Sequence, residues 1–175
     1  LTIFTVLLCL CCFLPNIIAG IPLTYGTDIK PEQVFFVSEF NNLMNAFFEN
    51  GVFPFYSWHM FLGNNFYASM SFYGNGDIFN FIGLLLQNMN FFDRTELLEC
   101  VKFFVASYTM YALLKEIGYT KLVRIFGSLC FAFSSWAIFF SGQSMFLSFY
   151  CLMPLYFLGI ERYFSKNSSI IFVLS

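Results

Sequence analysis

The first 21 residues, LTIFTVLLCLCCFLPNIIAGI, form an apolar run without a charged side chain. A helix rises about 1.5 Å per residue, so a run of this length spans the roughly 30 Å hydrocarbon core of a bilayer. A signal peptide is the alternative, because the small residues Ala19 and Gly20 can follow its hydrophobic region. We expect a membrane-spanning helix at 1–21, since the run is long for a signal peptide and more apolar segments follow.

The composition also favours lipid as the solvent. The 175 residues are 59% hydrophobic and 10% charged, whereas soluble domains average about 25% charged residues. The formal net charge of −2 and the absence of a basic run argue against a nucleic-acid partner. Six cysteines lie inside apolar runs, none at metal-ligand spacing with the single histidine, so we interpret them as small hydrophobic residues.

Further apolar segments predict more spans, at 96–114, 123–141, 144–160 and from about 169. We therefore expect an all-α membrane protein, a multi-pass bundle of transmembrane helices. Its first helix is 1–21, a large, partly helical extracytoplasmic loop occupies 22–95, and 96–175 holds helices 2–4 and the start of helix 5. The chain begins without Met and stops in an apolar run, so we expect an N-terminal fragment.

The positive charges set the expected orientation. An even number of spans separates the loops at 115–122 and 161–168, so these loops share one side of the membrane. They and their flanks hold five of the eight Lys and Arg residues, namely Lys115, Lys121, Arg124, Arg162 and Lys166. Lys and Arg concentrate on the cytoplasmic side, which places 22–95 outside.

Two helices are expected within 22–95. Pro31 and Glu32 suit a helix start, and Asn50-Gly51 suits its end. Helical spacing puts one apolar face at Phe36, Phe40, Leu43, Met44 and Phe47. The polar residues of the same stretch lie largely elsewhere on the helix, namely Ser38, Glu39, Asn41, Asn42 and Asn45. Such a helix lies either at the membrane interface or buried in an outer domain. The second segment, 79–92, is too short and too rich in Asn to span, so we expect an interfacial or re-entrant helix.

Two glycine-containing loops carry acids, YGTD with Asp28 and YGNGD with Asp77. Two carboxylates on converging loops can bind a divalent cation, or one can act as a general base toward a hydroxyl. The structural alternatives are a helix cap or dipole partner for Asp28 and a turn residue for Asp77. Between them, aromatic and amide side chains suit a sugar ring or, alternatively, an aromatic belt at the membrane surface. They are Tyr56, Trp58, His59, Asn64, Asn65, Phe66, Tyr67 and Tyr73.

Three stretches, YGTDIKPEQ, FPFYSWHMFLGNNFYASMSFYGNGDIFNFIGLL and MPLYFLGIERYFSKNSSIIFVLS, resemble the YfhO family of bacterial multi-pass membrane proteins. That family is similar to GT-C glycosyltransferases, which use a polyprenyl-phosphate-linked sugar donor. The resemblance implies a catalytic role for Asp28, with Gln33 as its companion. Gly63, Asn65, Tyr73 and Asp77 fall on the second stretch, where His59 replaces the usual Asn and Ile78 stands where Pro often follows the acid.

The resemblance thus implies a GT-C-type enzyme in the bacterial cell membrane that modifies a cell-envelope polymer or lipid on the outer face. Asp28 is its expected catalytic residue. Substrate contacts are expected from Gln33, Tyr56, Trp58, His59, Asn65, Tyr73 and Asp77. The expected partners are the bilayer, the sugar donor and an envelope acceptor, and a divalent cation is a candidate cofactor. The alternative is a non-catalytic multi-pass protein, either a transporter or an assembly scaffold.

Overall fold

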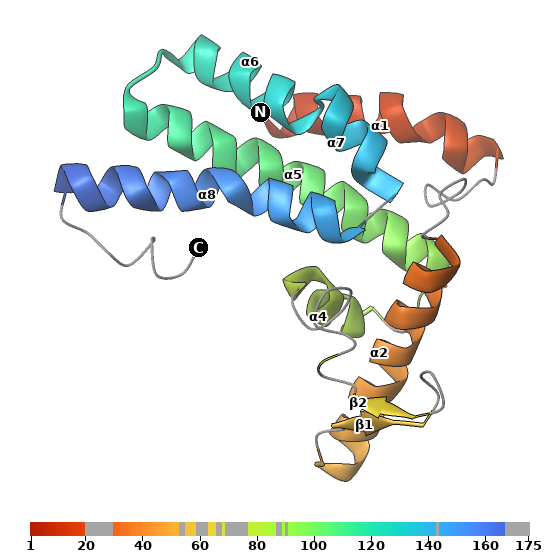
Figure 1. Ribbon diagram of the computed structural model, residues 1–175. Coiled ribbons are helices and arrows are strands. Elements are labelled where there is room, and N and C mark those ends of the chain that lie inside the picture. Colours follow the sequence, from red (N-terminus) through yellow and green to blue (C-terminus); the bar gives the residue numbers. More distant parts are fainter. Residues whose placement is uncertain are drawn as a thin grey trace. The chain divides into compact units, whose positions relative to one another are not determined.

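The computed structural model describes residues 1–19, 30–52, 55–58, 63–65, 68, 77–86, 89, 91–142 and 144–166. At 17, 30–37, 91, 92, 142, 144 and 166 only the backbone is described. The chain divides into two compact units. Unit 1 comprises Leu1–Leu23 and Glu96–Ser175, and unit 2 is Thr24–Thr95. The described residues are mainly helical, which confirms the expected helical class (Figure 1).

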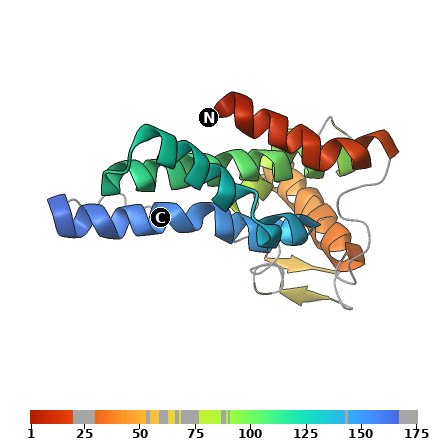
Figure 2. The same cartoon turned by 90° about the horizontal axis from the view of Figure 1, so that it is seen from above.

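Unit 1 is built from helices, the longest of which, α5 and α8, lie side by side (Figure 1). The helices are α1 (Thr2–Ala19), α5 (Phe91–Ile117, which starts in unit 2), α6 (Lys121–Ala132), α7 (Ser135–Phe139) and α8 (Ser144–Lys166), with the 3-10 turn η2 at Phe140–Gly142. Figures 1 and 2 both show α5 next to α8, and α6 returning in the opposite direction. Helix α5 begins five residues before the span that the sequence predicts there.

The core of unit 1 is apolar and draws on α1, α5, α7 and α8. Its buried members are Cys9, Phe13, Phe103, Ala137 and Leu147. The Phe13 and Phe103 ring centroids are 5.2 Å apart, which joins α1 to α5. The Phe133 ring stacks on that of Phe103, with the two ring centroids 5.2 Å apart. Complementary apolar shapes therefore make up this core, and they are supplied by the same runs that predict spans.

Polar contacts fix the register of α5 against α8. The Thr109 hydroxyl donates to the Cys151 carbonyl at 2.8 Å. Pro154, which lacks an N–H donor, interrupts the hydrogen bonding of α8 in the same region. Further along, an Arg162 nitrogen lies 3.0 Å from a Glu116 carboxylate oxygen. This ion pair puts the C-terminal ends of α5 and α8 together, so the basic residues around 115–124 and Arg162 lie at one end of unit 1.

The predicted span at 123–141 is a broken helix. Phe133, at the end of α6, has φ −103° and ψ 31°, and the Ser134 side chain then caps α7 by accepting from the Ala137 N–H. The Tyr150 hydroxyl of α8 donates to the Phe131 carbonyl at 2.7 Å, and its ring stacks on Phe131. The break occurs because Ser134 competes for the backbone and Tyr150 satisfies a carbonyl there.

Among the described residues, two helical segments are long and apolar enough to cross a membrane, Asp93–Ile117 and Lys121–Phe139. The second runs through α6 and α7. Thr2–Asn16 of α1 is apolar but shorter than these two segments. Helix α8 has 23 residues and is not one of the two segments. Membrane crossing by α1 and α8 stays a prediction.

Unit 2 contains α2 (Lys30–Asn50), strands β1 (Tyr56–Ser57) and β2 (Asn64–Asn65), and α4 (Ile78–Leu84). The expected helix over 31–49 is confirmed by α2. Gly51 ends it in the left-handed region, with φ 70°, and its N–H bonds the Phe47 carbonyl. Helix α4 is shorter than the expected 79–92 segment.

The predicted apolar face of α2 is described from Phe40 onward. Phe40 and Met44 are buried, and the Phe40 ring meets that of Phe81 of α4 edge-on at 5.2 Å. Leu43 and Phe47 are half-buried, and the Phe36 side chain lies outside the description. The expectation that Glu39 and Asn41 lie away from the packed face is wrong, because both are buried. Buried polar side chains on this helix therefore take part in the packing of unit 2.

Candidate functional site

Asp77 is the N-cap of α4. Its Oδ1 accepts a hydrogen bond from the Phe79 N–H at 2.9 Å, and the side chain is buried. A carboxylate in this position satisfies a free amide of the first turn and lies at the positive end of the helix dipole. The loop acid that the sequence singles out thus has a clear structural task.

Three of the predicted substrate residues come together on a small hairpin. Strands β1 and β2 pair antiparallel, with Tyr56 opposite Asn65. The Tyr56 and Trp58 rings meet edge to face, with centroids 5.0 Å apart. Trp58 is 76% exposed and Tyr56 48%. The hairpin therefore presents two aromatic surfaces beside exposed amides, on side chains that α2 does not cover.

Gly63 is required by the close packing inside this hairpin. Its φ of 104° lies in the left-handed region, and a Cβ there would overlap the Tyr56 hydroxyl oxygen. A side chain at position 63 would displace the tyrosine. The glycine thus fixes where the Tyr56 ring can lie relative to Trp58.

Glu39 anchors the hairpin to α2. Its buried carboxylate accepts a hydrogen bond from the Ser57 hydroxyl, which is also buried. Sequence reasoning assigned Glu39 to the polar face of its helix and did not identify this contact. The sequence signal for this contact is the alternation of side chains in β1, because Ser57 lies between Tyr56 and Trp58 and so points to the opposite face of the strand.

The remaining predicted site residues lie beyond what the structure describes. Asp28, His59 and Tyr73 are outside the described residues, as is the side chain of Gln33, whose backbone belongs to α2. Whether Asp28 approaches the hairpin or Asp77 therefore stays a prediction.

Two buried cations lie on α5. Arg94 is 7% exposed in the first turn of the helix, within unit 2. In unit 1, the Lys102 Nζ lies 3.0 Å from a Glu99 carboxylate oxygen, and both side chains are almost fully buried. This pair places a carboxyl group and an amine together in the interior beside an apolar helix, where each offsets the cost of burying the other.

The described residues contain no group of three or more His, Cys, Asp or Glu side chains that could hold a metal ion. A divalent cation at the Asp28 loop stays a prediction, because that loop falls outside the description.

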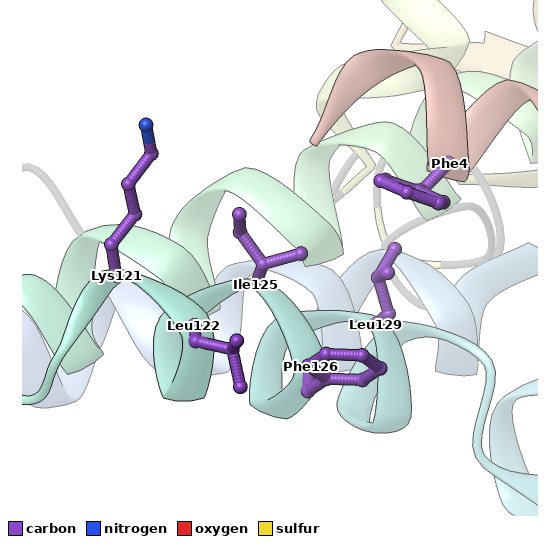
Figure 3. A pocket seen from close by; sticks show the side chains of 6 residues that line it. All are labelled: Phe4, Lys121, Leu122, Ile125, Phe126 and Leu129. Carbon is purple, nitrogen blue, oxygen red and sulfur yellow. The ribbon is translucent and has the colours of Figure 1, made fainter.

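An apolar pocket of about 310 Å³ lies between α1 and α6 in unit 1 (Figure 3). Figure 3 shows Lys121 at one end of the row of lining side chains and Phe4 at the other. The lining residues are Phe4, Lys121, Leu122, Ile125, Phe126 and Leu129. Since these side chains are apolar apart from Lys121 at one end, and include no acid, the pocket suits an aliphatic chain.

A family model described as bacterial membrane protein YfhO matches residues 27–175. No curated protein and no solved structure matches the chain significantly. The match covers the hairpin, α4 and the helices α5 to α8, and its description agrees with the two segments that are able to cross a membrane.

Proposed function

The chain belongs to the YfhO family of bacterial membrane proteins, and we propose that it acts as a GT-C-type glycosyltransferase in the bacterial cell membrane. It takes a sugar from a polyprenyl-phosphate donor and adds it to a cell-envelope polymer or lipid. Residues 22–95 face the outside and carry the site. Helices α1, α5, α6–α7 and α8 cross the membrane as a multi-pass bundle.

The observation that carries the proposal is the exposed Tyr56–Trp58 pair with Asn65 across the hairpin. A sugar ring has an apolar C–H face and a rim of hydroxyls. Aromatic faces pack against the C–H groups, and amide side chains bond the hydroxyls, which fixes the orientation of the ring. Both kinds of group stand together here on a short, anchored hairpin.

In the proposed reaction, Asp28 takes the proton of the acceptor hydroxyl while the oxygen of that hydroxyl forms a bond to the anomeric carbon of the sugar. The bond from that carbon to the phosphate oxygen breaks, and the polyprenyl phosphate leaves as an anion. A leaving anion needs a nearby cation or helix dipole. Arg94 and Lys30 are the candidates in unit 2, with a divalent cation as the alternative.

The first test is Asp28→Asn in the intact protein. This change keeps the size of the side chain and removes the base, so sugar transfer should fall about 10²- to 10⁴-fold while membrane insertion is normal. The matched control is Asp93→Asn, which makes the same change at an exposed position in the first turn of α5. Near-normal transfer by a well-inserted Asp28→Asn protein would disprove the catalytic role.

The second test separates binding from catalysis. Trp58→Ala should raise the KM for the sugar substrate about 2- to 10-fold, as expected from the loss of roughly 0.5–1.5 kcal/mol of aromatic packing. Phe48→Ala is the control, because Phe48 is also an exposed aromatic of unit 2 but lies on α2. Equal effects of the two substitutions on the KM would show that the hairpin is not part of the sugar-binding site.

A non-catalytic membrane protein, a transporter or an assembly scaffold, is the second candidate. The buried Glu99–Lys102 pair supports a transporter, because ionisable groups within a spanning segment often mark a path for ions or solutes. Absence of sugar transfer by the intact, well-inserted wild-type protein would put this candidate first.

A further inference from the structure

Helix α4 has an outward face that unit 2 does not cover. Ile78, Ile82 and Leu85 are 59%, 40% and 83% exposed, and Phe81, at the edge, is 43% exposed. Their spacing places all four on an arc of about 100° around the helix. The other side of α4 is buried, with Phe79, Asn80, Gly83 and Leu84 turned inward. The helix is thus apolar on two opposite faces, and its packing within unit 2 uses one of them.

The exposed face also lacks charge. The segment IFNFIGLLL, from Ile78 to Leu86, contains no ionisable residue, whereas the surface of a soluble domain normally carries interspersed charges. An apolar patch of this kind marks a place of interaction with lipid or protein. At seven residues, α4 is only about 10 Å long, much too short to cross a roughly 30 Å hydrocarbon core.

The position of α4 in the chain favours lipid over protein as the partner of this exposed face. Leu85 precedes Asp93 by eight residues, and Asp93 begins a segment able to cross the membrane. Eight residues reach at most about 29 Å when fully extended. The outward face of α4 is therefore tethered within about 29 Å of the start of the segment by which α5 can enter the membrane.

We propose that the outward face of α4 is a membrane-docking surface, which rests in the interface of the phospholipid bilayer. Ile78, Phe81, Ile82 and Leu85 contact the acyl chains, and the helix lies along the membrane plane, as interfacial helices do. Asp77, which caps α4, then lies at the depth of the lipid headgroups. The proposal requires only that α5 crosses the membrane, and it is independent of sugar transfer.

The test uses spin labels in the intact protein, reconstituted in vesicles of phosphatidylethanolamine and phosphatidylglycerol. The native cysteines are replaced, and one label is placed by Leu85→Cys or, as a matched control, by Glu49→Cys. Both positions are exposed in unit 2, so neither label should disturb the fold. Collisions with oxygen, which concentrates in the bilayer, are compared with collisions with a water-soluble nickel chelate.

We expect the label at position 85 to collide more with oxygen than with nickel, and the label at position 49 to show the reverse order. Preferential collision with nickel at position 85 would place α4 in water and overturn the proposal. Low collision rates with both reagents at position 85 would show that protein covers the face, which would overturn it equally. A label at Ile82 checks the result, because it lies on the same arc and should follow position 85.

Discussion

Units 1 and 2 bury different kinds of polar side chain. In unit 1, several buried hydroxyls bond a backbone carbonyl three or four residues earlier in the chain: Thr5 to that of Leu1, Ser128 to that of Ile125 and Ser141 to that of Ile138. In unit 2, the buried polar groups include carboxylates: Glu39 accepts from Ser57 of the hairpin, and Asp77 caps the start of α4. The helices of unit 1 satisfy several of their hydroxyls locally and add a few polar contacts between helices, whereas the hairpin of unit 2 is joined to α2 by a buried carboxylate.

The Glu99–Lys102 pair is the exception in unit 1, and breaking it should have the largest effect. Lys102→Met leaves the Glu99 carboxylate buried without the charge of its partner, which should lower the free energy of unfolding by about 3–5 kcal/mol. The exposed Lys115→Met is the control and should change it by less than about 0.5 kcal/mol. The measurement is denaturant unfolding of the intact protein in detergent micelles.

Replacing both members of the pair, by Glu99→Leu with Lys102→Met, should restore most of the lost stability, because no isolated charge is then buried. If Lys102→Met alone costs under about 1 kcal/mol, the ion pair does not stabilise unit 1. If the double variant is worse than the single one, the two groups do not act as a pair.

The second prediction concerns the anchor of the hairpin. Glu39→Ala and Ser57→Ala should each destabilise unit 2, and a double-mutant cycle should give a coupling energy of about 1.5–3 kcal/mol, typical of a hydrogen bond to a charged group. The control cycle pairs Ser57→Ala with Glu49→Ala, an exposed acid on the same helix, and should be additive. Additivity in the Glu39 cycle would mean that α2 and the hairpin are held together by other contacts.

The third prediction concerns the break between α6 and α7. Tyr150→Phe removes the donor to the Phe131 carbonyl and should cost about 1 kcal/mol of unfolding free energy. Tyr156→Phe, at an exposed ring of the same helix, should cost less. Equal losses would indicate that the tyrosine hydroxyl does not support the broken helix.

The smallest effect is expected at the cap of α4. Asp77→Asn should change stability by less than about 0.5 kcal/mol, because Asn caps helices nearly as well as Asp, whereas Asp77→Ala should cost about 1 kcal/mol. A fall in sugar transfer by a stable Asp77→Asn protein would show that this acid also contacts the substrate. An equal loss of stability in both variants would rule out the capping role.

The contrast between the units also explains which features could be predicted from sequence. Long apolar runs and the Pro31 and Gly51 signals predicted α2 and the helices of unit 1, because length, periodicity and caps are local properties. The break at Ser134 was missed because it depends on Tyr150, which is distant in sequence. The burial of Glu39 was missed for the same reason, since its partner Ser57 lies 18 residues away. The composition correctly indicated a membrane protein. Polar contacts between particular pairs of residues could not be inferred from the composition.

The central claim is that unit 2 lies outside the cell while the basic end of unit 1 lies in the cytoplasm. Single cysteines placed by Asn64→Cys in β2 and Lys121→Cys at the start of α6, in a background without other cysteines, test it directly. Both positions are exposed, so each should react wherever reagent reaches it. We predict that a membrane-impermeant thiol reagent labels position 64 in intact cells and labels position 121 only after the cells are opened. Labelling of position 121 in intact cells, with none at position 64, would contradict the account.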